Sequence, residues 1–284
     1  MKRSTHLRPV KTEAPAGFAP AFVAAVLDYA LAAPGAPPVF AIAGLQGSGK
    51  STLAAQLDSA CRARGRSAVV LSIDDFYLDH DEREHLGRTV HPLLATRGPP
   101  GSHDVDLACR TLDALRALPA GGPVRLPRFD KLDDRRLPAG QWPVVTHRPD
   151  LIVFEGWCLC VPPEAESGLV EPLNALEREQ DPDLTWRRHV NRALACYGPL
   201  WARLDRLLFL QGPGFGLVPD WRWEQECALQ AANPGRQAMT RKQVERFVQF
   251  FERISRQALR TLPTLADRVV RIDEARRPLD ELKP

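Results

Sequence analysis

The sequence predicts an α/β fold in which helices cover both faces of a parallel sheet of about five strands. Five short, continuous apolar runs have the character of buried strands, at residues 39–43, 67–73, 151–154, 207–210 and 268–272. Helical patterns lie between these runs, at residues 51–64, 104–118, 186–204, 221–232 and 240–262. Strands that alternate with helices form parallel sheets, and such sheets bind ligands at the carboxyl ends of their strands.

The chain is expected to divide at a Pro-rich break. Residues 18–33 favour a helix, and Pro-Gly-Ala-Pro-Pro at 34–38 then interrupts the chain. We therefore expect residues 1–37 to form an N-terminal extension, partly helical or disordered, and residues 38–284 to form the compact domain. The 284 residues are 44% hydrophobic and 26% charged, which provides enough apolar material for one sizeable core.

Charge and apolar patterning argue against several classes of partner. The 38 basic and 35 acidic residues give a net charge of +3, a balance that disfavours nucleic-acid or membrane binding. No stretch reaches the ~20 apolar residues of a membrane helix, and no apolar run follows the basic start as in a secretory signal. The six cysteines lack zinc spacing and are expected to be reduced thiols. We expect a cytoplasmic protein, and the sequence leaves its oligomeric state open.

The most specific motif is a phosphate-binding loop. Gly-Leu-Gln-Gly-Ser-Gly-Lys-Ser-Thr at 44–52 matches G-x-x-x-x-G-K-[ST] between a predicted strand and a predicted helix. The glycines let backbone N–H groups turn inward around phosphate oxygens, and the helix presents its positive dipole end. The motif predicts the P-loop NTPase fold and an ATP site formed by Gly44, Gln46, Gly47, Ser48, Gly49, Lys50, Ser51 and Thr52.

Three reaction classes are compatible with a P-loop: a GTPase switch, a partner-driven ATPase and a small-molecule kinase. Asn174, Asn191 and Asn233 all lack the N-K-x-D pattern that reads guanine. The strand at 151–154 ends in a lone Glu155 instead of the Asp-Glu pair usual in transport and motor ATPases. A kinase needs a base for the acceptor hydroxyl and a pocket for the acceptor. The sequence offers both, which favours the kinase.

Carboxylates at predicted strand ends are the candidates for catalysis and for magnesium binding. Asp74 and Asp75 follow the strand at 67–73 and are expected beside the P-loop. Asp74 is the predicted base, with Lys50 as the catalytic cation. Because side chains alternate along a strand, Asp75 is expected to differ in role and either ligates the metal through water or caps a turn. Ser51, Asp75 and Glu155 are predicted to hold Mg²⁺, which prefers oxygen ligands.

Two loops rich in Gly, Pro and basic residues are expected to bind the acceptor. Arg97 is suited to clamp a carboxylate, and His103 can hydrogen-bond hydroxyl groups. Asp104 either binds the acceptor or caps the helix that follows it. The cations of the loop at 126–135 suit an anionic acceptor, although such charge runs are usually solvated. The predicted acceptor-binding residues are Asp74, Tyr77, Arg97, His103, Asp104, Arg128, Asp130 and Lys131.

From residue 44 to about residue 273 the chain resembles the D-glycerate 3-kinase family. The resemblance rests on the order and spacing of residues 44–52, 72–78, 97–104, 127–131, 154–157 and 221–226. It implies transfer of the ATP γ-phosphate to a hydroxyl of glycerate, whose carboxylate Arg97 and Arg128 would hold. The chain is more distantly similar to uridine kinase, phosphoribulokinase and bacterial pantothenate kinase. By that likeness Asp74 matches their catalytic Asp, and Arg128 and Asp130 fall on the acceptor loop.

The alternatives are a kinase for another acceptor, such as a nucleoside or a pantothenate-like molecule, and a P-loop ATPase or switch without a small acceptor. The chain also departs from the family at residues 223–226, Trp-Glu-Gln-Glu, which are more acidic than the usual run there.

Residues 221–241 are expected to form a helical lid over the phosphates. They contain Arg222, Arg236 and Arg241, and closure of a lid would exclude the water that competes with the acceptor. Arg222 is assigned to the transferring phosphoryl group because of its place in the family motif. Trp221 and Trp223 either flank the adenine or pack in the core.

Overall fold

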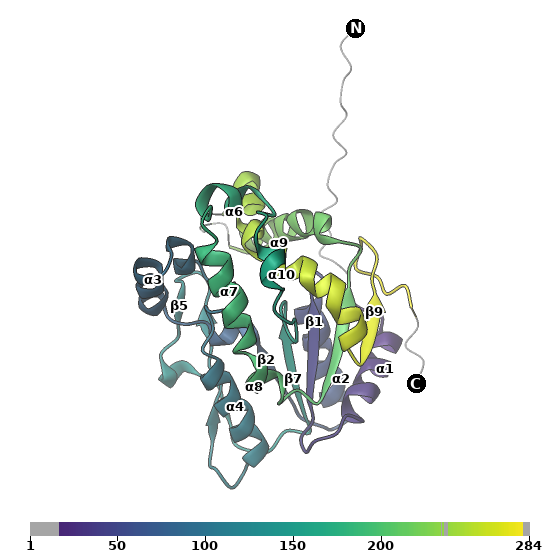
Figure 1. Ribbon diagram of the computed structural model, residues 1–284. Helices are drawn as coiled ribbons and strands as arrows, with labels where there is room; N and C mark the ends of the chain where they lie inside the picture. The colour runs from purple at the N-terminus through teal and green to yellow at the C-terminus, as the bar shows by residue number, and fades with distance from the viewer. Residues whose placement is uncertain (1–16, 234, 236–237, 281–284) are drawn as a thin grey trace.

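The computed structural model describes residues 17–233, 235 and 238–280 and places a five-stranded parallel sheet at the centre of the molecule (Figure 1). The strands lie in the order β2-β7-β1-β8-β9, and all neighbours pair in parallel. They are β1 Val39–Gly44, β2 Ala68–Ser72, β7 Leu151–Gly156, β8 Arg206–Gln211 and β9 Arg268–Arg271. The α/β fold predicted from the sequence is confirmed, and each predicted strand is present.

Burial on both faces explains why the central strands are continuous apolar runs. Every residue of β1 and β7 is buried. Phe40 and Ile42 belong to the apolar cluster on one face of the sheet, whereas Ala41 and Ala43 belong to the cluster on the other. This is the alternation expected of a strand, with both sides covered.

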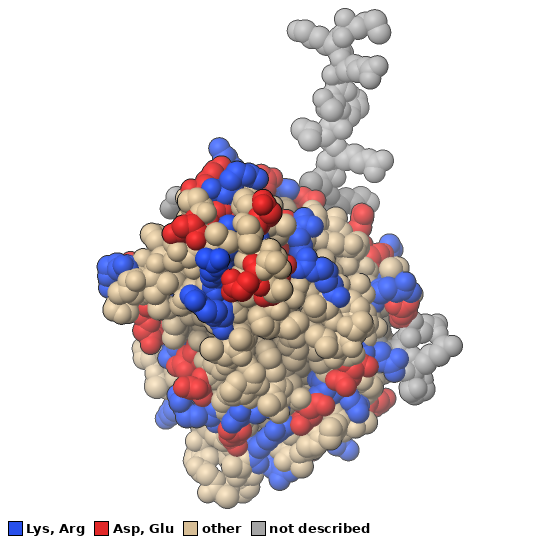
Figure 2. Space-filling model, viewed as in Figure 1, with Lys and Arg blue, Asp and Glu red and all other residues tan. Residues whose placement is uncertain are grey.

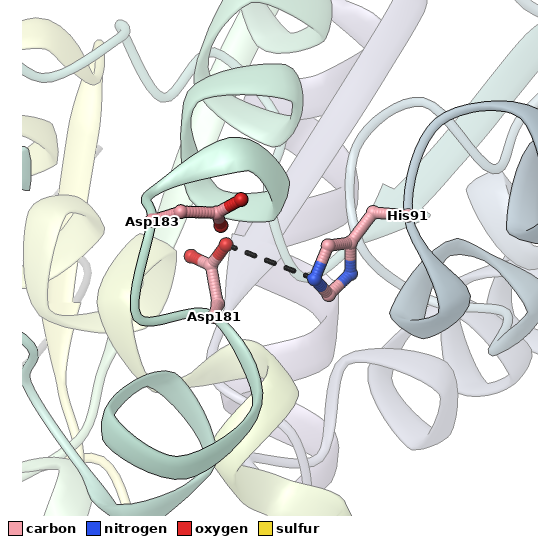
Figure 3. A group of neighbouring side chains, drawn as sticks. All are labelled: His91, Asp181 and Asp183. Atoms are coloured by element: carbon pink, nitrogen blue, oxygen red, sulfur yellow. Dashed lines mark ion pairs between the residues drawn. The ribbon is translucent and has the colours of Figure 1, made fainter.

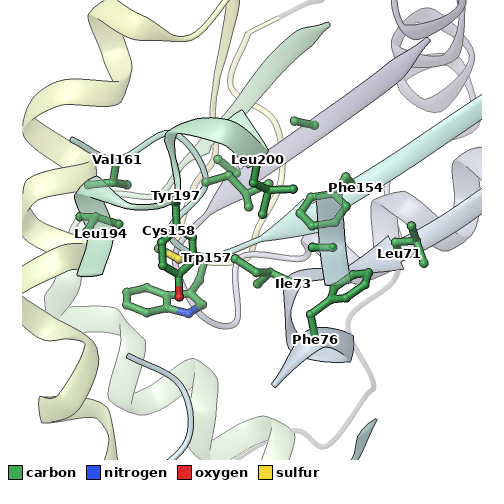
Figure 4. Close-up of a cluster of buried hydrophobic side chains, with 14 of the residues drawn as sticks. Leu71, Ile73, Phe76, Phe154, Trp157, Cys158, Val161, Leu194, Tyr197 and Leu200 are labelled. Atoms are coloured by element: carbon green, nitrogen blue, oxygen red, sulfur yellow. The ribbon is translucent and has the colours of Figure 1, made fainter. Parts of the chain in front are cut away.

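Helices form a layer on each face of the sheet. α1 Pro20–Leu31 and α2 Lys50–Ala63 pack on one face, and α4 Val105–Ala117, α7 Thr185–Ala195, α8 Gly198–Trp201 and α10 Arg241–Leu265 cover the other (Figure 1). In Figure 4, Leu194 of α7 and Leu200 of α8 gather with Phe154 of β7 in one cluster. α9 Val218–Ala232 packs against α10 in a third, smaller cluster.

The described part of the segment 1–37 packs with the sheet. Val26, Leu27 and Ala30 of α1 are fully buried and share a cluster with α2 and the central strands. The backbone N–H of Phe18, just before α1, donates to Gln56 Oε1 of α2 at 2.9 Å. This hydrogen bond holds the start of α1 against α2. Residues 1–16 lie outside the described residues.

Several elements differ from the sequence patterns because they are short or interrupted. The predicted helix at 186–204 is divided into α7 and α8, since Gly198 and Pro199 interrupt the pattern. The predicted strand at 67–73 ends at Ser72, and a 3₁₀ turn, Ile73–Phe76, follows. The helices that the sequence did not predict are α3 His80–Thr89, α5 Glu166–Leu169 and α6 Ala175–Gln180. The unpredicted 3₁₀ turns are Pro92–Ala95, Ala139–Gln141 and Phe215–Leu217. Two unpredicted pairs of short strands are β3 Val124–Arg125 with β6 Val144–Val145 and β4 Phe129–Asp130 with β5 Arg135–Arg136.

Charges of both signs are interspersed on the molecular surface. On the face drawn in Figure 2, basic and acidic groups lie among one another around a broad uncharged area. Ion pairs such as Arg203–Asp113 and Arg241–Asp220, each at 2.7 Å, join charges of opposite sign at the surface. None of the described helices combines the length and apolar character that a bilayer span requires.

Candidate active site

Three strand ends at the centre of the sheet define the candidate active site. β1 leads into the P-loop, β2 leads into the turn that carries Asp74 and Asp75, and β7 carries Glu155 near its end. The strand β7 lies between β1 and β2, so β2 is not the direct neighbour of β1, yet Asp74 after β2 is near enough to the P-loop to act on Lys50. Glu155 is in register with Ile42 of β1 and with Ser72 of β2. Glu155 therefore lies between the P-loop and the two aspartates.

The P-loop requires glycine at its tightest points. Gly47 and Gly49 have φ angles of 77° and 94°, in the left-handed region that glycine favours. A Cβ atom on Gly47 would lie 2.5 Å from the Cβ of Trp221 in α9. α2 begins at Lys50 with Gly49 as its N-cap, so no side chain takes the place of a phosphate at the helix end. Thr52, in the first turn of α2, is exposed.

The polar groups of the P-loop fit a bound triphosphate. Ser48 Oγ and Gln46 Oε1 are buried without a hydrogen-bond partner in the described part of the chain. Lys50 is 7% exposed, and its Nζ donates to the carbonyl of Leu45 at 2.9 Å. Burial lowers the pKa of Lys50, while the nearby carboxylates of Glu155 and Asp74 oppose that shift. Phosphate oxygens would accept from the Ser48 hydroxyl and from the Lys50 ammonium, whereas Gln46 Oε1 is itself an acceptor and would not pair with them.

Ser51, Glu155 and Asp75 supply oxygen atoms of the kind that magnesium prefers. Ser51 Oγ donates a hydrogen bond to Glu155 Oε1 at 3.0 Å. Asp75 Oδ2 accepts from the backbone N–H of Ser72 at 2.9 Å and from Arg128 at 3.2 Å. Burial raises the pKa of Asp75 to about 6, and Asp74 and Glu155 add to the rise. The three carboxylates are thus close enough to repel one another, which a divalent cation would relieve.

Both carboxylate oxygens of Asp74 accept hydrogen bonds from protein side chains. Tyr77 OH donates to Oδ1 at 2.7 Å, and Lys131 Nζ donates to Oδ2 at 2.6 Å. Burial by itself raises the pKa of Asp74, but the attraction of Lys131 and these hydrogen bonds outweigh it, so the pKa lies below its usual range. Asp74 is therefore ionised, and its carboxylate is near enough to Lys50 to act on the pKa of that ammonium.

Asp74 and Asp75 differ in their partners for a reason other than the predicted one. They lie in the 3₁₀ turn Ile73–Phe76, where Ser72 and Asp75 form a reciprocal capping box. The alternation of side chains along a strand therefore does not apply to them. This geometry shows the turn cap, one of the two roles left open for Asp75, and its role as a metal ligand stays a prediction.

Arg97 binds to the protein itself in this structure. Its guanidinium pairs with Asp134 and donates to the carbonyl of Lys131 at 3.0 Å. Asp134 also pairs with the buried Arg83 at 2.7 Å. The guanidinium groups of Arg83 and Arg97 also lie over the ring of Phe129, which adds cation–π contacts to these ion pairs. Asp134, which no motif indicated, thus fixes the loop that carries Lys131, and Arg97 takes part in holding it.

Asp130 and Asp104 have structural hydrogen bonds. Asp130 Oδ1 accepts from the backbone N–H groups of Leu132 at 2.8 Å and of Asp133 at 3.2 Å, which shapes the turn between β4 and β5. Asp104 is the N-cap of α4 and accepts from the N–H of Leu107 at 2.9 Å. Of its two open roles, the helix cap is the one that the structure shows.

His103 lies in a buried aromatic stack and is held in one tautomer. Its ring stacks on Tyr77 with 4.6 Å between centroids, and its Nδ1 lies 2.7 Å from Tyr197 OH. Because the N–H of Gly101 already donates to Tyr197 OH at 3.0 Å, the tyrosine hydrogen is directed to Nδ1. Burial lowers the pKa of His103 to about 4, so the neutral ring carries its hydrogen on Nε2. That buried Nε2 has no partner among the described residues.

Tyr197 was missed by the sequence analysis because it lies in the connection between α7 and α8, within a stretch predicted as one helix. It is 1% exposed, and its ring packs edge-on against His103 with 5.8 Å between centroids. Only the fold brings these two residues together.

The segment predicted as a lid, residues 221–241, starts inside α9. Trp221 is 2% exposed and packs on the P-loop, so core packing is the correct alternative for this residue. Arg222 lies 3.4 Å from the buried Glu226 and over the ring of Phe247. Arg236 lies outside the described residues. Whether Arg222 reaches a phosphoryl group stays a prediction.

Arg276 contacts the P-loop from the far end of the chain. Its Nε donates to the carbonyl of Gly47 at 2.6 Å, its guanidinium pairs with Glu224 at 2.7 Å, and it lies over the ring of Trp221. No sequence pattern indicated it, because it follows the last strand in an irregular segment without a motif.

A group of neighbouring potential ligands, His91, Asp181 and Asp183, lies apart from these residues (Figure 3). Asp181 is fully buried and accepts the backbone N–H groups of Trp186 at 2.7 Å and Arg187 at 3.1 Å. His91 Nδ1 accepts a backbone N–H of the following turn at 3.2 Å, so the neutral ring carries its hydrogen on Nε2. That nitrogen faces Asp181 at 3.9 Å and has no lone pair for a metal. The group is therefore a structural contact.

No family model matches the chain, but relatives do. The chain is 34% identical over 205 residues to the uncharacterized kinase mug58 of Schizosaccharomyces pombe, across 69% of this chain and 73% of that protein. It is 32% identical over 263 residues to the chloroplastic D-glycerate 3-kinase of Arabidopsis thaliana, across 86% of this chain. The chain belongs to the kinase family of the Schizosaccharomyces pombe protein and is similar to D-glycerate 3-kinase.

The likeness to the D-glycerate 3-kinase family extends to the fold. The structure of D-glycerate 3-kinase from Cryptococcus neoformans var. grubii has a TM-score of 0.73 to this chain at 24% identity, covering 91% of this chain and 95% of that one. This chain spans 54% of the length of the plant protein. As a member of a kinase family, the chain is an ATP-dependent phosphotransferase, as the sequence predicted.

Proposed function

We propose that this protein transfers the γ-phosphate of ATP to a hydroxyl group of D-glycerate. The observation that carries the proposal is the position of Asp74, an ionised carboxylate between the P-loop cation Lys50 and the loop cation Lys131. A base in this place can face the acceptor hydroxyl while Lys50 faces the phosphates. The activity named for the plant and fungal relatives supports D-glycerate as the acceptor.

The P-loop and the three oxygen donors are proposed to hold Mg²⁺-ATP. The backbone of residues 44–52 would surround the phosphates, with Lys50 against the β- and γ-phosphates. Ser51, Asp75 and Glu155 would hold the cation directly or through water. When bound, Mg²⁺-ATP supplies the phosphoryl group and the charge neutralisation that its transfer requires.

Asp74 is proposed to accept the proton of the acceptor hydroxyl. The acceptor oxygen forms its bond to the γ-phosphorus as the bond from phosphorus to the bridging β–γ oxygen breaks, and the hydroxyl proton passes to Asp74. Tyr77, which donates to Oδ1 at 2.7 Å, holds the carboxylate in orientation. Since this step asks for positioning more than for a strong base, an ionised carboxylate of low pKa suffices.

Lys131 and Arg128 are proposed to bind the glycerate carboxylate. Arg128 lies 3.2 Å from Asp75, beside the base, and Lys131 lies at Asp74 itself. The unpartnered Nε2–H of His103 provides a further donor in the wall behind Tyr77. Cations next to the base select an acceptor in which an anionic group lies close to a hydroxyl, as in a hydroxy acid.

The free thiols of the chain support a cytoplasmic location. All six cysteines are unpaired, and burial raises the pKa of Cys160 to about 12. Thiols that remain unpaired are usual where the environment is reducing.

The test is an ADP-release assay with Mg²⁺-ATP across D-glycerate, L-glycerate, uridine, pantothenate and ribulose 5-phosphate. The proposal predicts turnover with D-glycerate that is lost in Lys50→Ala. Turnover with another acceptor alone would retain the kinase but refute glycerate. ADP release that ignores every acceptor would favour a P-loop ATPase.

A further inference from the structure

Each oxygen of the carboxylate that the proposed reaction needs already accepts a hydrogen bond from the protein. Oδ2 of Asp74 lies 2.6 Å from Lys131 Nζ, and Oδ1 lies 2.7 Å from Tyr77 OH. An acceptor hydroxyl must donate its hydrogen to one of these oxygens before transfer. Contact with an ammonium neutralises the charge of this oxygen and restricts approach to it, so the carboxylate becomes a better acceptor for a hydroxyl hydrogen when one of the two partners leaves.

Tyr77 is not the partner that leaves. It is 4% exposed, its ring stacks on His103 with 4.6 Å between centroids, and Phe129 packs edge-on against it at 5.2 Å. Moving the phenol would break this stack and leave its buried hydroxyl without a partner. The bond from Tyr77 to Oδ1 is therefore a fixed part of the site.

The side chain of Lys131 can move while its backbone stays in place. The side chain is 56% exposed and lies in the turn between β4 and β5. Its carbonyl accepts from Arg97 at 3.0 Å, and Asp134, at the end of the same turn, is held by Arg83 and Arg97. An ammonium on a flexible four-carbon stem can thus swing from Asp74 to a ligand a few ångströms away without rearranging the loop.

We propose that Lys131 masks Asp74 in the enzyme without acceptor, and that an anionic acceptor unmasks the base by drawing the Lys131 ammonium onto its own carboxylate. The inference rests on the proposed function, because it assumes that Asp74 is the base and that the acceptor is an anion. Water and neutral polyols have no charge with which to displace Lys131. The ion pair therefore protects ATP from hydrolysis and makes Lys131 a specificity-determining residue for anionic hydroxy compounds.

The test compares wild type with Lys131→Met, which keeps the length of the side chain but removes the charge. Two rates are measured: ATP hydrolysis without any acceptor, and phosphorylation of D-glycerate against glycerol, a neutral analogue. Lys131→Met is expected to raise acceptor-free hydrolysis several-fold and to reduce the preference for glycerate over glycerol. Lys242→Met, at an exposed position of α10, is the matched control and is expected to change neither rate.

A second variant shows whether the effect acts through Asp74. In Lys131→Met/Asp74→Asn the increase in hydrolysis is expected to disappear, since no base remains to be unmasked. Hydrolysis that stays at or below the wild-type rate in Lys131→Met would overturn the masking proposal, as would an increase that persists in the double variant. The hydrolysis readout uses no acceptor, so its outcome is separate from a failure of wild type to phosphorylate glycerate.

Discussion

Ser51 Oγ donates a hydrogen bond to Glu155 Oε1 at 3.0 Å, which joins the first turn of α2 to the end of β7. The contact spans 104 residues of sequence and connects α2, the helix after the P-loop, with β7, which pairs with β1 in the sheet. It sets a hydroxyl and a carboxylate side by side, an arrangement suited to orient a magnesium ion.

Glu155→Gln is expected to weaken magnesium binding while leaving the fold intact. The amide oxygen can still accept from Ser51, but the negative charge is gone, so the apparent affinity for Mg²⁺ should fall roughly 10–100-fold. The check is a magnesium titration in the ADP-release assay. Glu166→Gln, at an exposed residue, is the control, and equal magnesium dependence in both variants would remove Glu155 from the metal site.

His103 is expected to make stability depend on pH. Its pKa in the folded protein is about 4, whereas the unfolded chain binds the proton near ~6.5. The unfolded state therefore binds more protons between these values, and the free energy of unfolding falls as pH drops through this window, by at most roughly 3 kcal/mol. The contribution is fully present above the unfolded pKa.

Urea unfolding between pH 4 and pH 7 measures this dependence. His103→Gln should flatten it, while His85→Gln, at an exposed residue, should leave it as in wild type. The same slope in His103→Gln as in wild type would show that other groups cause it.

Asp134→Asn is expected to destabilise the protein and to loosen the loop of Lys131. Arg83 is 1% exposed and would lose its carboxylate partner, at a cost of about 2 kcal/mol. The KM for the acceptor should rise because Lys131 is then held less firmly. Asp133→Asn, at the exposed neighbour, should alter neither unfolding nor KM. A stable Asp134→Asn variant with unchanged KM would argue against this positioning role.

Gly47→Ala is expected to damage ATP binding. The new Cβ would meet the Cβ of Trp221 at 2.5 Å, and φ is 77°, so the loop and α9 must separate at a cost of roughly 1–3 kcal/mol. Calorimetry with a non-hydrolysable ATP analogue should show a large loss of affinity. Gly140→Ala, where the Cβ would meet nothing within 4 Å, provides the control. Unchanged affinity in Gly47→Ala would show that the close approach of Trp221 is unimportant.

The predictable parts of this protein are those that local chemistry determines. The P-loop was found because phosphate binding fixes the spacing of Gly44, Gly49 and Lys50, and the strands were found because burial on both faces makes them apolar. The order of the strands was not predictable, so the place of Glu155 between β1 and β2 was missed.

The residues that hold the site together were less accessible to sequence reasoning. Tyr197 meets His103 across 94 residues, and Arg276 meets Gly47 across 229. Neither residue lies in a motif, and each gains its role only through packing. Arg97 had the right chemistry for an acceptor clamp, but Asp134 competes for it in the fold.

The most direct test of the central claim is a paired measurement on Asp74→Asn. The rate of phosphoryl transfer to D-glycerate is measured in a single turnover, and binding of a non-hydrolysable ATP analogue is measured by calorimetry. If Asp74 is the base, transfer falls by about 10²–10⁴-fold while nucleotide affinity is retained, because the P-loop is untouched. A rate close to wild type with normal nucleotide binding would contradict the account and move the catalytic base elsewhere in the site.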